Sequence, residues 1–154
     1  MTYLIGIDPG ATGAIVVMTP KFDLIEWDVM PTIKVGTHTR VNAAALAAML
    51  VEFDAGHAYL EQVGAMPGQG VASMFSFGHA AGTASGVLAA LHITTTLVTP
   101  QSWKKRAGLS GTDKDAARSR AIQLWPSWRA LDAKGKGQAL ADAALLARFG
   151  GAGA

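Results

Sequence analysis

The chain opens with two runs of β-branched and aliphatic residues around a short turn, and this pattern constrains the fold most strongly. Residues 3–8 (YLIGID) precede Pro9-Gly10, and residues 14–18 (AIVVM) follow it. Two such runs joined by a Pro/Gly turn predict a β-hairpin. Residues 24–30 alternate well enough to add a third strand. The first 30 residues are therefore predicted to form an antiparallel meander.

The remaining chain alternates helical and strand patterns. A basic helix is expected with Thr112 as its cap and Asp115 three residues later, ending at Pro126. Gly135–Gly137 is expected to be a loop. Further helices are predicted over 43–53, 72–91 and 138–148, and strands over 58–61 and 93–98. A meander followed by alternating strands and helices predicts an α/β fold, a mixed five-stranded sheet with helices on both faces.

Length and composition exclude several classes of protein. The chain has 154 residues, which suits one domain, expected over 1–149 with a flexible tail at 150–154. Cysteine is absent, which excludes disulfide scaffolds, thiol nucleophiles and Cys-ligated zinc or iron–sulfur sites. Apolar stretches are interrupted well before 18 residues, and the N-terminus lacks a basic signal region. We therefore expect a soluble, cytoplasmic protein without a membrane span.

The net charge of +2 conceals a strong asymmetry along the chain. Residues 1–100 carry three basic and seven acidic groups, a net charge of −4. Residues 101–136 carry nine basic and three acidic groups, a net charge of +6. Such a basic segment favours a polyanionic partner, and the alternative is a solvated basic face without one. Trp103, Trp125 and Trp128 lie among these basic residues, where they either stack on bases or pack in the core.

Three acidic residues stand in apolar surroundings. Asp8 ends the first predicted strand, Glu61 ends the fourth, and Asp142 lies within the apolar run 139–146. A carboxylate in such a run is costly unless it is paired, hydrogen-bonded or bound to a metal. If the first and fourth strands are adjacent, Asp8 and Glu61 converge, and Asp142 reaches the same point from the last helix. Three oxygen donors without His or Cys favour Mg²⁺ or Mn²⁺. The alternative is three ordinary surface acids.

The order of the motifs resembles the RuvC-type Holliday-junction resolvases of the RNase H-like superfamily. The resemblance covers almost the whole chain. It is carried by Ile5–Gly10 with Gly13, Leu60–Val63, Ser73–Leu91 with Gly78 and Gly82, Thr99–Lys105, Gly111–Lys114 and Ala141–Ala147.

The resemblance implies an RNase H-like fold and a metal-dependent endonuclease that cuts four-way DNA junctions as a homodimer. It implies that Asp8, Glu61 and Asp142 are catalytic and hold two Mg²⁺ ions, with Mn²⁺ as a substitute. The basic segment would contact the DNA phosphates, and its expected DNA-binding residues are Lys104, Lys105, Lys114, Arg118, Lys134 and Lys136.

Two positions depart from the family pattern. A fourth acid usually stands three residues before the last one, where this chain has Ala139, so Gln138 or Lys136 is a candidate substitute. Cellular members place a junction-wedging aromatic three residues after the catalytic Glu, where this chain has Gly64. Both departures resemble the phage-encoded branch. Candidates for the wedge are Met74 and Phe75, with Met66 and Phe77 as further ones, and each has core packing as its alternative.

Three other functions fit parts of the pattern. A junction-binding protein that has lost catalysis would explain the missing fourth acid. An ATPase domain of the sugar-kinase and actin-like class also begins with Gly-Ile-Asp-x-Gly, but such proteins enclose the nucleotide between two domains. A general RNase H-like nuclease acting on RNA–DNA hybrids is compatible with the basic segment, because both backbones attract positive charge.

Overall fold

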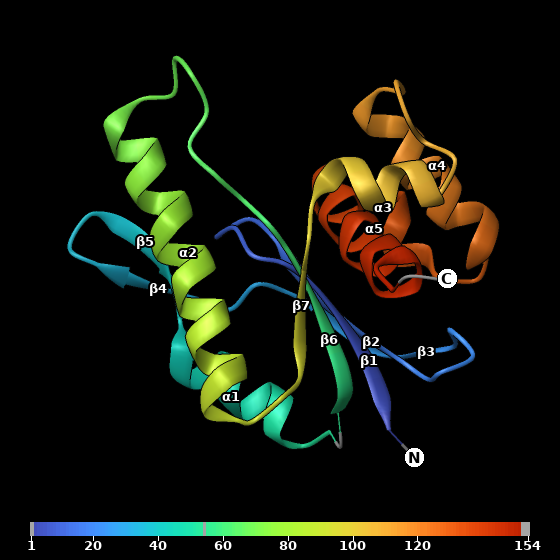
Figure 1. Cartoon of the computed structure of the whole chain (residues 1–154), viewed down its shortest axis with the longest axis horizontal. Helices are drawn as coiled ribbons and strands as arrows, with labels where there is room; N and C mark the ends of the chain where they lie inside the picture. Colours follow the sequence, from blue (N-terminus) through green and yellow to red (C-terminus); the bar gives the residue numbers. More distant parts are fainter. Residues whose placement is uncertain (1, 54, 152–154) are drawn as a thin grey trace.

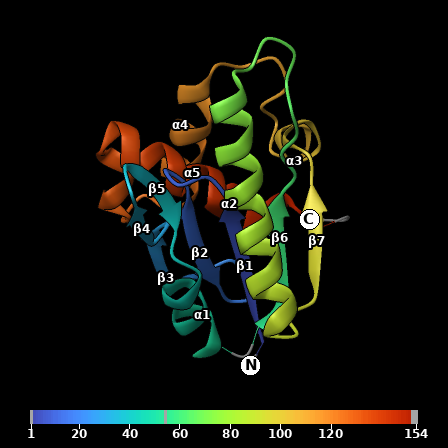
Figure 2. The same cartoon turned by 90° about the vertical axis from the view of Figure 1, so that its left-hand side faces the viewer.

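A five-stranded mixed sheet forms the centre of the computed structural model, which describes residues 2–53 and 55–151. The strand order is β3-β2-β1-β6-β7 (Figure 2). The meander pairs are antiparallel, whereas β1–β6 and β6–β7 are parallel. The predicted mixed sheet is therefore confirmed. Its strands are β1 (Tyr3–Asp8), β2 (Ala14–Met18), β3 (Leu24–Val29), β6 (Ala55–Glu61) and β7 (Thr95–Val98).

Helices cover both faces of this sheet, as predicted (Figure 1). One face carries α1 (Ala43–Val51) and α2 (Val71–Ala90). The other carries α3 (Pro100–Arg106), α4 (Lys114–Leu124), α5 (Lys134–Phe149) and a 3₁₀ turn, η1 (Arg129–Asp132). No helix in the described part of the chain is long and apolar enough to cross a membrane.

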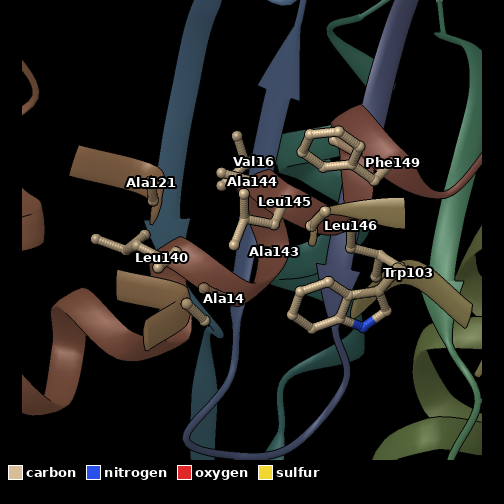
Figure 3. Close-up of a cluster of buried hydrophobic side chains, with 14 of the residues drawn as sticks. Ala14, Val16, Trp103, Ala121, Leu140, Ala143, Ala144, Leu145, Leu146 and Phe149 are labelled. Carbon is tan, nitrogen blue, oxygen red and sulfur yellow. The ribbon is translucent and has the colours of Figure 1, made fainter. Parts of the chain in front are cut away.

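Strand alternation divides the core into two apolar layers. On β2, Ile15 and Val17 pack toward α1 and α2, whereas Ala14, Val16 and Met18 pack toward α5 (Figure 3). Successive side chains of a strand point to opposite faces. On β1 and β6 the same alternation directs the last residue of each strand to the α5 face.

Helix α5 approaches β1 closely because Gly6 has no side chain. A Cβ at this position would overlap the carbonyl oxygen of Ala143 and lie 2.9 Å from the Cβ of Ala147. The facing surface of α5 is itself rich in buried alanines. Small residues on both elements therefore set the depth at which α5, and with it Asp142, lies over the sheet.

A second, two-stranded sheet was not expected from the sequence. It consists of β4 (Thr32–Val35) and β5 (His38–Val41), paired antiparallel. Gly36 in its turn has a φ of 62°, which suits a tight hairpin connection. Most of its residues are exposed, so the two short strands carry little of the buried alternation that identifies a strand in sequence.

Two expected helix starts were wrong, and one further helix was not expected. Helix α5 begins at Lys134, because Gly137 packs against the Leu131 backbone and joins the helix instead of a loop. Helix α4 is capped by Asp113, whose side chain accepts from the backbone N–H of Ala116. The hydroxyl of Thr112 donates instead to the Leu109 carbonyl. A separate helix, α3, precedes α4.

The C-terminal end of α5 is anchored to its surroundings. Gly150 lies buried against the ring of Tyr59, and its carbonyl accepts a hydrogen bond from Arg106. Of the tail expected at 150–154, residues 152–154 lie outside the described residues.

Candidate active site

Two of the three predicted acids stand at the same edge of the sheet. Asp8 ends β1 and Glu61 ends β6, and these strands are adjacent and parallel. Ile7 pairs with Leu60, so the two acids occupy equivalent positions one residue further along. Both follow the strand alternation toward the α5 face. The expected adjacency of the first and fourth predicted strands is thus confirmed.

The third acid, Asp142, comes to this edge from α5. It is partly buried, and it lies beside Ala143, which packs against β1 at Gly6. Gln138 stands one helical turn earlier, and its Nε2 donates a hydrogen bond of 3.0 Å to Asp142 Oδ1. This neutral donor orients the carboxylate without balancing its charge.

The three carboxylates are close enough to influence one another's charge. Burial, followed by the charge of Glu61, raises the pKa of Asp8 to about 6. A hydrogen bond from the Gly10 backbone N–H acts in the opposite direction. Burial, followed by the charges of Asp8 and Glu61, raises the pKa of Asp142 to about 7. Burial also raises the pKa of Glu61, while a hydrogen bond from Trp103 and the charge of Lys104 lower it. Burial therefore disfavours the charged form of each of the three carboxyl groups, and for Asp8 and Asp142 the charges of neighbouring carboxylates add to this effect.

This cluster suits a divalent cation in its chemistry but does not form a closed site. Its donors are carboxylate oxygens, which hard cations such as Mg²⁺ and Mn²⁺ prefer. Burial, and after it the repulsion between the carboxylates, raises the pKa values of Asp8 and Asp142, and a bound cation would favour their charged forms. Within residues 2–53 and 55–151, however, no three His, Asp or Glu side chains already form a metal-binding group. The carboxylates would have to draw together around an ion.

An open cleft of about 760 Å³ begins at this cluster. Asp8 and Asp142 are among its lining residues, whereas Glu61 is not. Lysines from three different helices, and small or hydroxyl-bearing residues from the loops, form much of the rest. These lining residues include Lys104, Lys114, Lys136, Ala11, Thr12, Thr32, Thr112, Gln138 and Ala139. A cleft lined by both carboxylates and lysines can accept a phosphodiester backbone.

The predicted basic residues divide into two groups. Lys104, Lys114 and Lys136 line the cleft. Lys105 and Lys134 are exposed, and each is within two residues of one of these lysines in the sequence. Arg118 differs, because its guanidinium already serves a structural role. It forms a 3.1 Å salt bridge with Asp115 and donates to the backbone carbonyls of Leu131 and Asp132, which ties α4 to η1.

The expected wedge residues lie on α2, away from the cleft lining. Met74 is 36% exposed and Phe75 is 60% exposed. The guanidinium of Arg40 stands 5.2 Å from the centroid of the Phe75 ring. A second hollow, of about 360 Å³, lies beyond the end of β6, and Met66 and Phe77 line it instead.

The three tryptophans of the basic segment are core residues. Trp103 is fully buried, and Trp125 and Trp128 are 9% and 7% exposed. Base stacking is therefore excluded for the folded chain. Trp103 has a further contact that the sequence did not indicate: its Nε1 donates a 2.7 Å hydrogen bond to Glu61 Oε2. The two residues are 42 positions apart, and no local signal connects them.

Comparison with known proteins identifies the fold. No protein-family model matches the chain, and no curated protein resembles it significantly. Solved structures do match. The structure of T. thermophilus RuvC in complex with a Holliday junction substrate superimposes with a TM-score of 0.67 at 17% identity, covering 97% of each chain. The chain has the RuvC fold.

A second RuvC structure supports this assignment. The structure of Thermus thermophilus RuvC matches with a TM-score of 0.58 at 16% identity, again over 97% of both chains. The likeness to RuvC covers the sheet and both helical layers, in agreement with the expected RNase H-like architecture. At such identities the likeness to RuvC describes the fold, and the chemistry has to be argued from this chain's own residues.

Proposed function

We propose that this protein is a metal-dependent endonuclease that cuts branched DNA, with the four-way Holliday junction as its main substrate. The observation that carries the proposal is the cluster of Asp8, Glu61 and Asp142, which adjoins a lysine-lined cleft in a RuvC fold. One RuvC of this fold has been solved with a Holliday junction substrate. The sequence motifs and the local electrostatics support the same chemistry.

In this proposal Asp8, Glu61 and Asp142 hold two Mg²⁺ ions, with Mn²⁺ as a substitute. Such ions supply activation of the attacking water and stabilisation of the charge on the transferred phosphoryl group. Asp8 is central, because it occupies the strand end between Glu61 and α5. Lys104 contributes positive charge to Glu61 and Asp142, and it is suited to hold the phosphate being cut.

The cleft positions the DNA backbone on either side of the cut. Lys114 begins α4 and Lys136 lies in the first turn of α5, so each can hold a phosphate that flanks the cleaved one. Lys105 and Lys134 extend this basic surface. Arg118 contributes less, since its guanidinium already binds carbonyls and Asp115.

A homodimer would place two such sites on one junction. The outer face of α2 supports this part of the proposal, because Val71 is 86% exposed and Gly78, Gly82 and Gly86 leave open space along the helix. Met74 and Phe75 on this helix remain our candidates for a wedge at the branch point. The Gly64 and Ala139 departures also fit the phage-encoded branch of the resolvases.

The test is a cleavage assay on labelled four-way, three-way, RNA–DNA hybrid and linear duplex substrates. Each is incubated with Mg²⁺ or Ca²⁺, using the native chain and the Asp8→Asn variant. We expect paired symmetric nicks on the four-way junction in Mg²⁺ alone, and their loss with Asp8→Asn. Cleavage that survives Asp8→Asn would refute the assignment, and preference for the hybrid would indicate a general RNase H-like nuclease.

A junction-binding protein without catalysis is the second candidate. Two observations favour it: Ala139 stands where a fourth acid is expected, and the described acids form no closed metal group. Ala139 lines the cleft, so an Asp there would join the cluster. Tight junction binding with no cleavage by the native chain, together with activity in Ala139→Asp, would establish this candidate.

A further inference from the structure

We propose that Trp103 is a positioning residue for Glu61, and that its indole N–H prepares the carboxylate cluster to bind a divalent cation. The inference rests on the proposed function, because it assigns Glu61 to a metal site. It goes further, because it requires a fixed hydrogen-bond donor in addition to the three acids. A residue of the apolar core, 42 positions away, sets the orientation of one ligand.

The contact itself has the geometry of a strong hydrogen bond. Trp103 Nε1 lies 2.7 Å from Glu61 Oε2, and the indole is fully buried. An indole has one donor and no acceptor, and a donor to an ionised carboxylate gives a short, charge-assisted bond. Among the hydrogen bonds of the described residues, no other one reaches the Glu61 side chain.

The indole has little freedom to move. Its helix, α3, is capped by Thr99, whose hydroxyl accepts from the backbone N–H of Ser102. At the other end of α3, Arg106 donates to the carbonyls of Phe149 and Gly150, at 3.0 and 2.8 Å, which joins α3 to the end of α5. Figure 3 shows the ring packed beside the α5 side chains. A fixed donor therefore acts on a carboxylate whose side chain has three rotatable bonds.

Holding Glu61 matters because only the Trp103 hydrogen bond and the charge of Lys104 oppose the effect of its burial. Burial disfavours its charged form, and its negative charge also raises the pKa of Asp8 and of Asp142. Without a fixed donor, the side chain would turn toward water and leave the cluster. Residues that orient a metal ligand through a hydrogen bond typically contribute about 10- to 100-fold to metal affinity.

The chain supplies its own matched controls. Trp125 is also buried and its Nε1 donates at 2.9 Å, but to the carbonyl of Phe22. Trp128 Nε1 is buried with no partner within the part of the chain that the structure describes. Trp103→Phe thus removes a hydrogen bond to a carboxylate, Trp125→Phe removes one to a carbonyl, and Trp128→Phe removes none. Each variant keeps an aromatic ring. At position 103 this matters because the native ring lies 5.6 Å from Lys104 Nζ.

The test is titration of the purified chain with Mn²⁺ alone, followed by the EPR signal of the free ion, without DNA. We expect Trp103→Phe to weaken Mn²⁺ binding about tenfold or more, and Trp125→Phe and Trp128→Phe to leave it unchanged. Melting curves of the three variants without metal check that each remains folded. Equal Mn²⁺ affinity in Trp103→Phe and the native chain would overturn the inference.

A second measurement uses the native chain and needs no substitution. In ¹H–¹⁵N spectra, the indole peak of Trp103 should shift as Mg²⁺ is added, whereas those of Trp125 and Trp128 should not. An unmoved Trp103 peak would overturn the inference. A native chain whose Mn²⁺ binding depends on Trp103, yet which cuts no DNA, would preserve the inference and refute the proposed nuclease.

Discussion

At the scale of single residues, the three acids make the protein sensitive to pH in the absence of metal. The pKa of Asp142 is raised from 3.8 to about 7, and that of Asp8 to about 6. The folded state therefore binds more protons than the unfolded state between about pH 4 and pH 7. The free energy of unfolding consequently falls as pH rises through this window.

Replacing Asp142 by Asn should remove the part of this fall in the free energy of unfolding that Asp142 causes. Asn keeps an oxygen that can accept from Gln138 Nε2, so the hydrogen bond of the native side chain is retained. In EDTA at pH 8 we expect Asp142→Asn to be more stable than the native chain by about 1–3 kcal/mol, with the gain disappearing near pH 4. Urea unfolding at both pH values measures it. Glu26→Gln, at an exposed strand position, controls for the change in net charge. A gain that is the same at both pH values would contradict the explanation.

The sequence indicated these acids but not the groups that hold them. Asp8, Glu61 and Asp142 could be selected because each is flanked by apolar residues, where a free carboxylate is costly. Gln138 is one helical turn from Asp142 and was already a candidate. Trp103 was not, because its link to Glu61 depends on how α3 packs against the sheet. Such a contact has no trace in local sequence.

At the scale of elements, the position of α5 decides whether Asp142 reaches β1. The helix lies against Gly6, with the Ala143 carbonyl and Ala147 in the space that a side chain would need. We expect Gly6→Ala to destabilise the fold by about 1–3 kcal/mol and to weaken Mn²⁺ binding, because α5 must move outward. Urea unfolding and the EPR titration measure the two effects.

Gly135→Ala is the matched control for this prediction. Gly135 is in the first turn of the same helix, and a Cβ there would meet nothing within 4 Å. We expect it to leave stability unchanged or raise it by up to about 1 kcal/mol, as Ala replaces Gly in a helix. If Gly6→Ala proves as harmless as Gly135→Ala, the close approach does not control the site.

Elements could be predicted where their residues are buried, and were missed where they are not. The strands of the main sheet carry β-branched residues whose alternation follows the two core layers. The β4–β5 hairpin is mostly exposed and lacks that signal. The start of α5 was missed for another reason. Gly135 and Gly137 have low helix propensity, but packing of Gly137 against Leu131 outweighs it.

At the scale of the whole molecule, the asymmetric charge should govern DNA binding. Lys114 and Lys136 line the cleft from two different helices, α4 and α5. Each Lys→Ala change should weaken binding to all DNA substrates and lower the slope of log affinity against log salt by about 0.9. Fluorescence anisotropy over a salt series measures it. Lys21→Ala, in the turn at the other end of β2, should leave the slope unchanged. An unaltered slope in both cleft variants would remove the cleft from the DNA-binding surface.

The outer face of α2 decides how two sites come to act on one junction. Its inner side packs on the sheet through Ala80, Ala84 and Leu88, so the stripe of Gly78, Gly82 and Gly86 faces away from the core. A Cβ on any of these glycines would meet nothing within 4 Å. Small residues on an exposed helix face allow a second helix to approach closely. In the proposed homodimer this stripe is the natural seam, beside the exposed rings and aliphatic side chains of the same helix.

A bulky charge in the stripe should therefore separate the subunits. We expect the native chain to sediment at twice its mass of 15.9 kDa, and Gly82→Arg to sediment as a monomer. Because each subunit carries one set of acids, the monomer should nick single strands of a four-way junction and lose the paired symmetric cuts. Ala48→Arg, at an exposed position of α1, should change neither property. A native chain that sediments at 15.9 kDa when free, and that binds each junction as a single copy, would exclude the dimer, since one set of acids cannot cut two opposed strands at once.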